Sequence, residues 1–172
     1  AQFIYVDVTE GWRLVMTGSL SDVEELPTYV AATGGNQPTA TGCIVCTNYK
    51  VHTFTGPGTF TVTDAGSPTG SNSVDYLVVA GGGSGGKYYG GGGGAGGYRE
   101  SPGAASGCYT ASPLGVSPAA AIAVSASPGS YSIAVGGGAA GVPGCNTPGL
   151  DGSVSTFDSI TSAGGGGGGG AP

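Results

Sequence analysis

A short apolar segment that passes directly into glycine constrains this chain more than any other feature. Residues 74–80 (VDYLVVA) are rich in the β-branched and aromatic side chains of a buried strand, and residues 81–97 are mostly glycine. Such a glycine density leaves an α-helix or a packed sheet almost without side chains to bury. The glycines therefore form either a flexible tether or extended helices that pack backbone to backbone.

We expect the glycine segments to pack. An extended helix with three residues per turn makes no internal hydrogen bonds, so its neighbours must satisfy its amides and carbonyls at close range, and only glycine permits this on every side. The pattern also recurs, because residues 131–135 (YSIAV) precede one glycine run and residues 153–162 precede the run at 164–170. Flexible tethers, in contrast, are usually diluted with serine and charge.

The composition argues against several classes of partner. The chain has 172 residues, of which 39 are glycine and only 8% are charged, with a net charge of −6 and four lysines plus arginines. There is thus no basic footprint for nucleic acid or for an anionic membrane surface. No apolar segment approaches the ~20 residues of a membrane span, so we expect no membrane insertion. We interpret the chain as a fragment or processed product.

Three segments follow from the pattern: a β-hairpin segment (residues 1–27), a linker (28–48) and a glycine-rich domain (49–172). The first hairpin has strands at 3–8 and 12–16, with apolar side chains on both faces. A lone hairpin is marginal in water, so self-association about an axis would cover its second face. The expected interface of this self-association consists of Phe3, Ile4, Tyr5, Val6, Trp12 and Leu14. A second hairpin is predicted from residues 49–54 and 59–63.

The first hairpin resembles a known trimerisation unit. The segment FIYVDVTEGWRLVMTGSL, about the first twenty residues, is similar to the hairpin that follows the collagenous region in the collagen XV/XVIII family. The resemblance implies a homotrimeric fibre whose stalk precedes residue 1. Residues 1–27 would be its trimerisation segment, and the six side chains of the expected interface would form the trimer interface. The alternative is an ordinary hairpin that packs on its own domain.

A second resemblance covers about residues 49–172. The segments KVHTFTGPGTFTVTDAG, VDYLVVAGGGSGG, GGGGGAGGYRE, YSIAVGGGAAG and STFDSITSAGGGGGGG follow the order seen in the glycine-rich domain of bacteriophage tail fibres and tail-fibre adhesins. The resemblance implies a virion-surface, extracellular fibre tip in which glycine helices support variable loops. Those loops would meet a host surface receptor, either a polysaccharide or an outer-membrane protein. The chain departs from the family by a 98–126 insertion rich in alanine, serine and proline.

Two sequence patterns match catalytic motifs but lack residues or elements that the chemistry needs. Gly81, Gly86 and Lys87 match most of a phosphate-binding loop, but position 88 is Tyr where Mg²⁺ needs a hydroxyl, and no stable helix can follow. Residues 82–86 match a nucleophile elbow, but the only histidine, His52, lies in a strand pattern. We therefore expect a protein that is not an enzyme and has no cofactor.

The four cysteines are Cys43, Cys46, Cys108 and Cys145. A zinc site would want a second close pair, and a redox site would want the 43–46 motif at the start of a helix, so we expect no metal and favour disulfides. A bond between Cys108 and Cys145 is the first choice, with Cys43 and Cys46 as a local loop or free thiols. The sequence allows three pairings.

Tyrosines and cations beside the glycine runs are the candidates for receptor contact. Tyrosine and arginine are favoured in recognition surfaces because they combine large area with hydrogen bonding. The candidates are Lys87, Tyr88, Tyr89, Tyr98, Arg99 and Tyr109. In the alternative reading these tyrosines wedge or cap the glycine helices.

Together these observations predict an all-β chain with packed polyglycine-II-type helices and negligible α-helix, a segment of a trimeric fibre. The predicted function is that of a structural and host-recognition component of a phage tail fibre, with itself and a host receptor as partners. The alternative is a structural subunit of an extracellular bacterial filament or matrix that binds no receptor.

Overall fold

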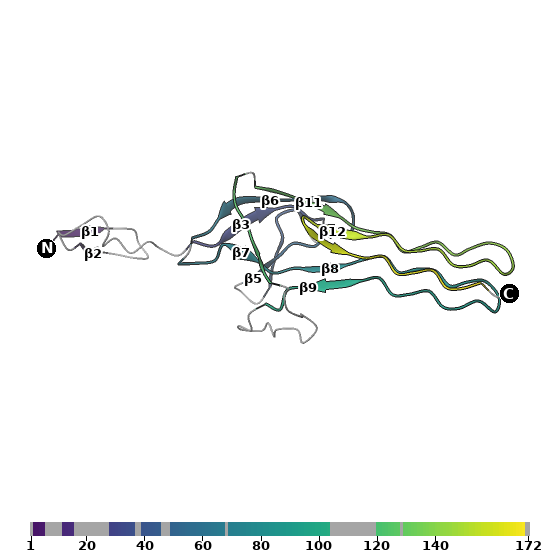
Figure 1. The fold of residues 1–172 in the computed structure, drawn as a ribbon. Coiled ribbons are helices and arrows are strands. Elements are labelled where there is room, and N and C mark those ends of the chain that lie inside the picture. The colour runs from purple at the N-terminus through teal and green to yellow at the C-terminus, as the bar shows by residue number, and fades with distance from the viewer. Residues whose placement is uncertain are drawn as a thin grey trace.

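The computed structural model describes residues 2–5, 12–15, 28–36, 39–45, 49–67, 69–103, 120–127 and 129–170. All of these residues lie in strands or loops, and none of them lies in a helix. The prediction of an all-β chain with negligible α-helix is therefore confirmed for the described part. Figure 1 shows a body of strands from which long loops extend in one direction.

The start of the chain forms a two-stranded antiparallel sheet. β1 (Gln2–Tyr5) pairs with β2 (Trp12–Val15), and Tyr5 lies opposite Trp12. The predicted pairing of this hairpin is confirmed for the described residues. Val6 lies outside the described residues, and the trimer interface assigned to this hairpin stays a prediction.

The main sheet has five antiparallel strands in the order β13-β12-β11-β6-β3. In chain order they are β3 (Val30–Thr33), β6 (Gly58–Ala65), β11 (Ser130–Ala134), β12 (Ser155–Phe157) and β13 (Ile160–Ser162). The long strand β6 lies between β3 and β11, so it connects both halves of the sheet.

The core is small and aromatic. Alternation along β6 buries Phe60 and Val62, as expected for a strand with one covered face. The ring of Phe60 meets Phe157 edge-on, with centroids 6.0 Å apart, and Tyr131 lies 6.3 Å from Phe157. Edge-to-face aromatic pairs at this spacing contribute beyond their buried area, so a few rings anchor a glycine-rich chain.

The second predicted hairpin, between residues 49–54 and 59–63, is wrong in its pairing. β5 (Tyr49–Val51) pairs instead with β4 (Cys43–Val45), while β6 pairs with β3 and β11. The long-range partners of β6 bring the aromatic rings of the core together, and a local hairpin would not. Tertiary packing thus overrides the local turn signal.

Residues 28–48, predicted as a linker, contribute two strands, β3 and β4. Ala32 of β3 is buried and pairs with Val62 at the edge of the main sheet. The alanine and threonine side chains of β3 are small or polar, so the strand has no clear hydrophobic pattern in the sequence. The division of the chain into three segments stays a prediction.

Two small sheets lead toward the glycine segments. β7 (Ser73–Val74) pairs with β10 (Ile122–Ala123), and β8 (Leu77–Val79) pairs with β9 (Tyr98–Glu100). The strand predicted at 74–80 is thus divided between β7 and β8. β8 and β11 each pass almost directly into glycine, as the sequence predicted.

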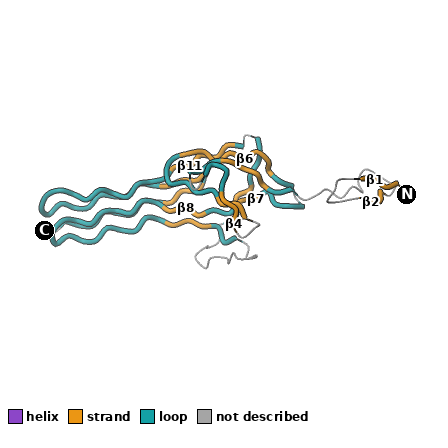
Figure 2. Tube along the Cα trace, turned by 180° about the vertical axis from the view of Figure 1, so that it is seen from behind, coloured by secondary structure: helices purple, strands orange, loops and turns teal. Residues whose placement is uncertain are grey.

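The glycine-containing segments extend from these strands as five runs. They are run 1 (residues 80–87), run 2 (90–97), run 3 (136–142), run 4 (147–153) and run 5 (163–170). The runs lie side by side in opposite views (Figure 1, Figure 2), and backbone hydrogen bonds join them. They are packed against one another, in place of forming a free tether.

Candidate functional site

Hydrogen bonds between the runs repeat every third residue. From run 1 to run 2 the donor and acceptor pairs are Ala80–Gly97, Gly83–Gly94 and Gly86–Gly91, each 2.9 Å from N to O. From run 1 to run 4, offset by one residue, they are Gly81–Ser153, Ser84–Leu150 and Lys87–Thr147. A β-ladder alternates with a period of two, so the runs satisfy their polar groups in another way.

Run 5 lies against three other runs. Run 2 donates to it in the pairs Gly91–Gly169, Gly94–Gly166 and Gly97–Ala163. Run 4 donates to run 5 in the pairs Gly149–Gly168 and Gly152–Gly165. Run 5 in turn donates to run 1 in the pairs Gly165–Gly81 and Gly168–Ser84. Run 5 therefore joins runs 1, 2 and 4 into one bundle.

The close approach of the backbones requires glycine at many positions of the bundle. A β-carbon on Gly96 would lie 1.9 Å from the carbonyl oxygen of Ala80, and one on Gly164 would lie 1.9 Å from that of Gly152. Nothing would lie within 4 Å of a β-carbon on Gly92. Glycine is thus a steric requirement at the first two sites and not at the third.

Three side-chain oxygens take the place of backbone carbonyls in the bundle. Ser84 Oγ accepts from the Leu150 amide (2.9 Å), and Asp151 Oδ1 accepts from the Gly167 amide (2.7 Å). At the start of run 3, Ser155 Oγ accepts from the Gly136 amide (2.9 Å). These polar side chains therefore fix how neighbouring runs align.

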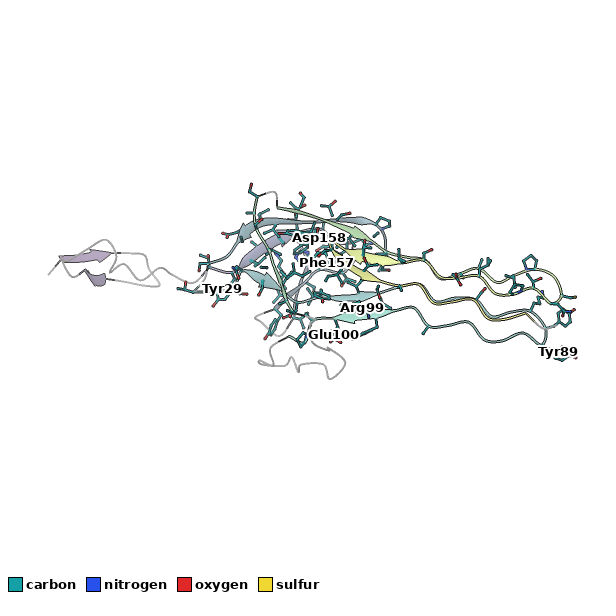
Figure 3. The ribbon with its side chains drawn as sticks, in the orientation of Figure 1. Tyr29, Tyr89, Arg99, Glu100, Phe157 and Asp158 are labelled. Carbon is teal, nitrogen blue, oxygen red and sulfur yellow. The ribbon has the colours of Figure 1, made fainter. Side chains whose placement is uncertain are left out.

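Two loops meet where the runs turn, and we call residues 87–90 and 143–148 the distal tip. The first loop joins run 1 to run 2, and the second joins run 3 to run 4. The amide of Lys87 donates to the carbonyl oxygen of Thr147 at 3.1 Å, which links the loops directly. Figure 3 shows Tyr89 at the far end of the runs, pointing away from them.

Three residues of the distal tip have a left-handed backbone conformation. Tyr88 has φ 63°, Asn146 has φ 55° and Gly144 has φ 92°. Glycine and asparagine adopt this region readily, whereas a bulky aromatic residue does so at a cost. Tyr88 therefore occupies a position where glycine would be the easier residue.

The tip also presents the most exposed aromatic surface of the described chain. Tyr89 is 92% exposed and Tyr88 is 68% exposed. Lys87 is exposed beside them, and neither loop contains aspartate or glutamate. The tip is thus locally cationic in a chain whose net charge is −6.

The structure divides the predicted contact residues between two places. Lys87, Tyr88 and Tyr89 lie together in the distal tip, whereas Tyr98 and Arg99 lie in β9 at the opposite end of run 2. Figure 3 shows the separation of Arg99 from Tyr89. The Tyr98 hydroxyl donates to a carboxylate oxygen of Glu100, and Arg99 Nη1 donates to the Tyr98 carbonyl at 3.3 Å.

The sixth predicted contact residue, Tyr109, lies outside the described residues, and sequence reasoning missed the second loop of the tip. Its residues 143–148 (PGCNTP) carry no aromatic ring and no charge. Proline, glycine and asparagine in close succession are nevertheless a turn signal, which could have identified a reversal there.

Cys43 and Cys145 are exposed, and neither forms a disulfide with another described residue. Cys145 lies in the second loop of the distal tip, and Cys43 lies in β4. Cys46 and Cys108 lie outside the described residues, so the proposed pairing of Cys108 with Cys145 stays a prediction.

The residues that match catalytic motifs in the sequence have structural roles in the fold. Gly81, Gly86 and Lys87 belong to run 1, which turns into run 2 and not into a helix. His52 Nδ1 lies 2.8 Å from the Gly34 carbonyl oxygen, and its ring meets Phe60 edge-on. Among the described residues, no cluster of side chains suited to a metal ion occurs, and no helix is long and apolar enough to cross a membrane.

Strands that lead into a bundle of glycine runs are the architecture of a glycine-rich domain. Comparison with protein families matches residues 53–172 to the glycine-rich domain family, and the chain belongs to this family. No curated protein and no solved structure matches the chain.

Proposed function

We propose that the five runs are polyglycine-II-type helices with three residues per turn. The support is the three-residue repeat of the backbone hydrogen bonds, because residues i and i+3 of such a helix point in the same direction. The positive φ angles of glycine belong to residues outside the runs, as expected for a left-handed extended form with φ of about −75°. Run 2 then spans roughly 25 Å at about 3.1 Å per residue.

The function that this bundle supports best is attachment of a phage tail fibre to a host cell surface. One observation carries the proposal: a cross-bonded bundle ends in a tip whose two tyrosines, Tyr88 and Tyr89, face solvent. A stiff bundle holds its loops away from the strands and presents them preorganised, which reduces the entropy lost on binding. The likeness of residues 49–172 to tail-fibre tips agrees with this function.

The chain would act as a homotrimer on the virion, outside the host cell. The hairpin of β1 and β2, similar to a collagen-associated trimerisation unit, supplies the association. Three tips on one fibre would bind a repetitive surface with avidity well above that of a single tip. The receptor is a host polysaccharide or outer-membrane protein, and neither catalysis nor a cofactor is involved.

Binding to cell envelopes from a panel of bacterial species, together with mass in solution, tests the proposal. We expect a trimer that is retained saturably by the envelopes of some species and not by those of others. Retention by none of them would overturn the attachment function. Spontaneous growth into long fibres without other virion proteins would favour the alternative, a structural subunit of an extracellular filament.

A further inference from the structure

We propose that the distal tip binds an acidic saccharide chain through Tyr88, Tyr89 and Lys87. This inference rests on the attachment function proposed above and narrows its receptor to one chemical class. It follows from three properties of the tip: the backbone of Tyr88, the size of the surface, and the chemistry of its side chains.

The backbone of Tyr88 indicates that its side chain is needed. The residue has φ 63°, a region that costs an aromatic residue free energy and costs glycine almost nothing. The chain has 39 glycines, and both runs that flank this turn are made mostly of them. A tyrosine in a strained turn, with 68% of its surface exposed, is not explained by packing. Strain of this kind is concentrated at functional sites.

The exposure of Tyr89 rules out the capping role that the sequence left open for it. A tyrosine that capped the ends of the glycine helices would bury its ring against them, but Tyr89 is 92% exposed. Figure 3 shows its side chain directed away from the runs. An aromatic ring held in water in this way is available to a ligand.

The tip is too small for an ordinary protein partner. A stable protein–protein interface uses roughly 20–30 residues on each side, and the two loops of the tip supply about ten. A saccharide chain needs a much smaller surface, since one or two sugar rings can cover one or two aromatic faces. The narrow end of the bundle therefore fits a thin, chain-like ligand.

The side chains of the tip suit a sugar that carries a negative charge. The face of a tyrosine ring stacks on the C–H groups of a sugar ring, and its hydroxyl exchanges hydrogen bonds with sugar hydroxyls. The exposed side chain of Asn146, in the second loop of the tip, offers a further donor and acceptor. Lys87 is the only side chain of the loops that is charged at neutral pH, and it favours a carboxylate or phosphate on the ligand.

Chemical treatment of the envelopes that retain the full-length protein distinguishes the ligand classes. Periodate cleaves vicinal diols of sugars, whereas protease removes exposed protein. We expect retention to survive protease and to be lost after periodate. Loss after protease with survival after periodate would overturn the saccharide inference and leave the attachment function standing. Retention by no untreated envelope would overturn both.

Variants then locate the binding surface, with the polysaccharide purified from a retaining envelope as the probe. Tyr89→Ala should weaken binding by about tenfold, the size expected for a central aromatic contact. Lys87→Gln should weaken it about two- to fivefold and remove most of its salt dependence. Tyr88→Gly should weaken binding while the thermal midpoint rises, a combination that a structural role for Tyr88 would not produce.

Tyr29→Ala is the matched control, because Tyr29 is 66% exposed and lies in the strand-rich body, far from Tyr89 in Figure 3. This variant should bind the polysaccharide as the unaltered chain does. Equal binding by Tyr89→Ala and Tyr29→Ala would contradict the assignment of the site to the distal tip.

Discussion

Gly96 and Ala80 approach so closely that a β-carbon on Gly96 would lie 1.9 Å from the Ala80 carbonyl oxygen. The clash would be with backbone, which cannot rotate away as a flexible side chain can. Run 1 and run 2 are also joined here by the hydrogen bond from the Ala80 amide to the Gly97 carbonyl. The two runs thus meet at a distance that only glycine allows.

Gly96→Ala should therefore destabilise the chain. Relief of the clash requires run 2 to move away from run 1, and we expect a loss of about 1–3 kcal/mol in the free energy of unfolding, as for overpacked cores. Gly92→Ala, in the same run, is the control, since nothing lies within 4 Å of its added carbon. The free energy of unfolding should stay unchanged or rise by up to about 1 kcal/mol, because alanine lowers the conformational entropy of the unfolded chain. Equal losses in urea titrations of the two variants would contradict the packing described.

Amide hydrogen exchange should reveal the three-residue period directly. The amides of Gly91, Gly94 and Gly97 donate to run 5 and should exchange slowly, while those between them in run 2 exchange faster. Protection of every second amide would indicate a β-ladder instead. Fast exchange along all of residues 81–97 and 164–170 would remove the basis for a stiff bundle.

Tyr88→Gly should raise the free energy of unfolding by about 1 kcal/mol. The gain comes from relief of the left-handed backbone of tyrosine, which costs roughly 1–2 kcal/mol, less the extra entropy of glycine in the unfolded chain. Tyr89→Gly is the control, because Tyr89 has no positive φ and should gain nothing. Thermal unfolding of both variants checks this, and a loss of stability in Tyr88→Gly would show that its ring is structural.

The parts of this fold that could be predicted from sequence are the strands that are specified by neighbouring residues in the chain. β8 and β11 were foreseen because an apolar run ends at glycine, and the β1–β2 hairpin because apolar strands flank a turn. The partners of β6 could not be foreseen, because its edges are covered by strands far away in the chain. Their register depends on the packing of aromatic rings that no local window contains.

The candidate site was predicted in part for a similar reason. Residue type alone identified Lys87, Tyr88 and Tyr89, but it grouped them with Tyr98 and Arg99, which are close in sequence. An extended run separates the two groups by its full length, so neighbours in sequence become the opposite ends of the bundle. The contribution of residues 143–148 depends on the bond between Lys87 and Thr147, which has no local signal.

Asp151 should hold run 4 and run 5 in register, because its Oδ1 accepts from the Gly167 amide at 2.7 Å. Asp151→Ala should cost about 1 kcal/mol, the net value of one hydrogen bond, and should speed exchange at the Gly167 amide. Asp151→Asn keeps an acceptor oxygen at the same position and should retain most of the stability and protection. Leu150→Ala is a further control, since this exposed side chain projects from the same run while its amide still donates to Ser84 Oγ. If Asp151→Ala and Leu150→Ala left the Gly167 amide equally protected, the side chain of Asp151 would have no part in aligning the runs.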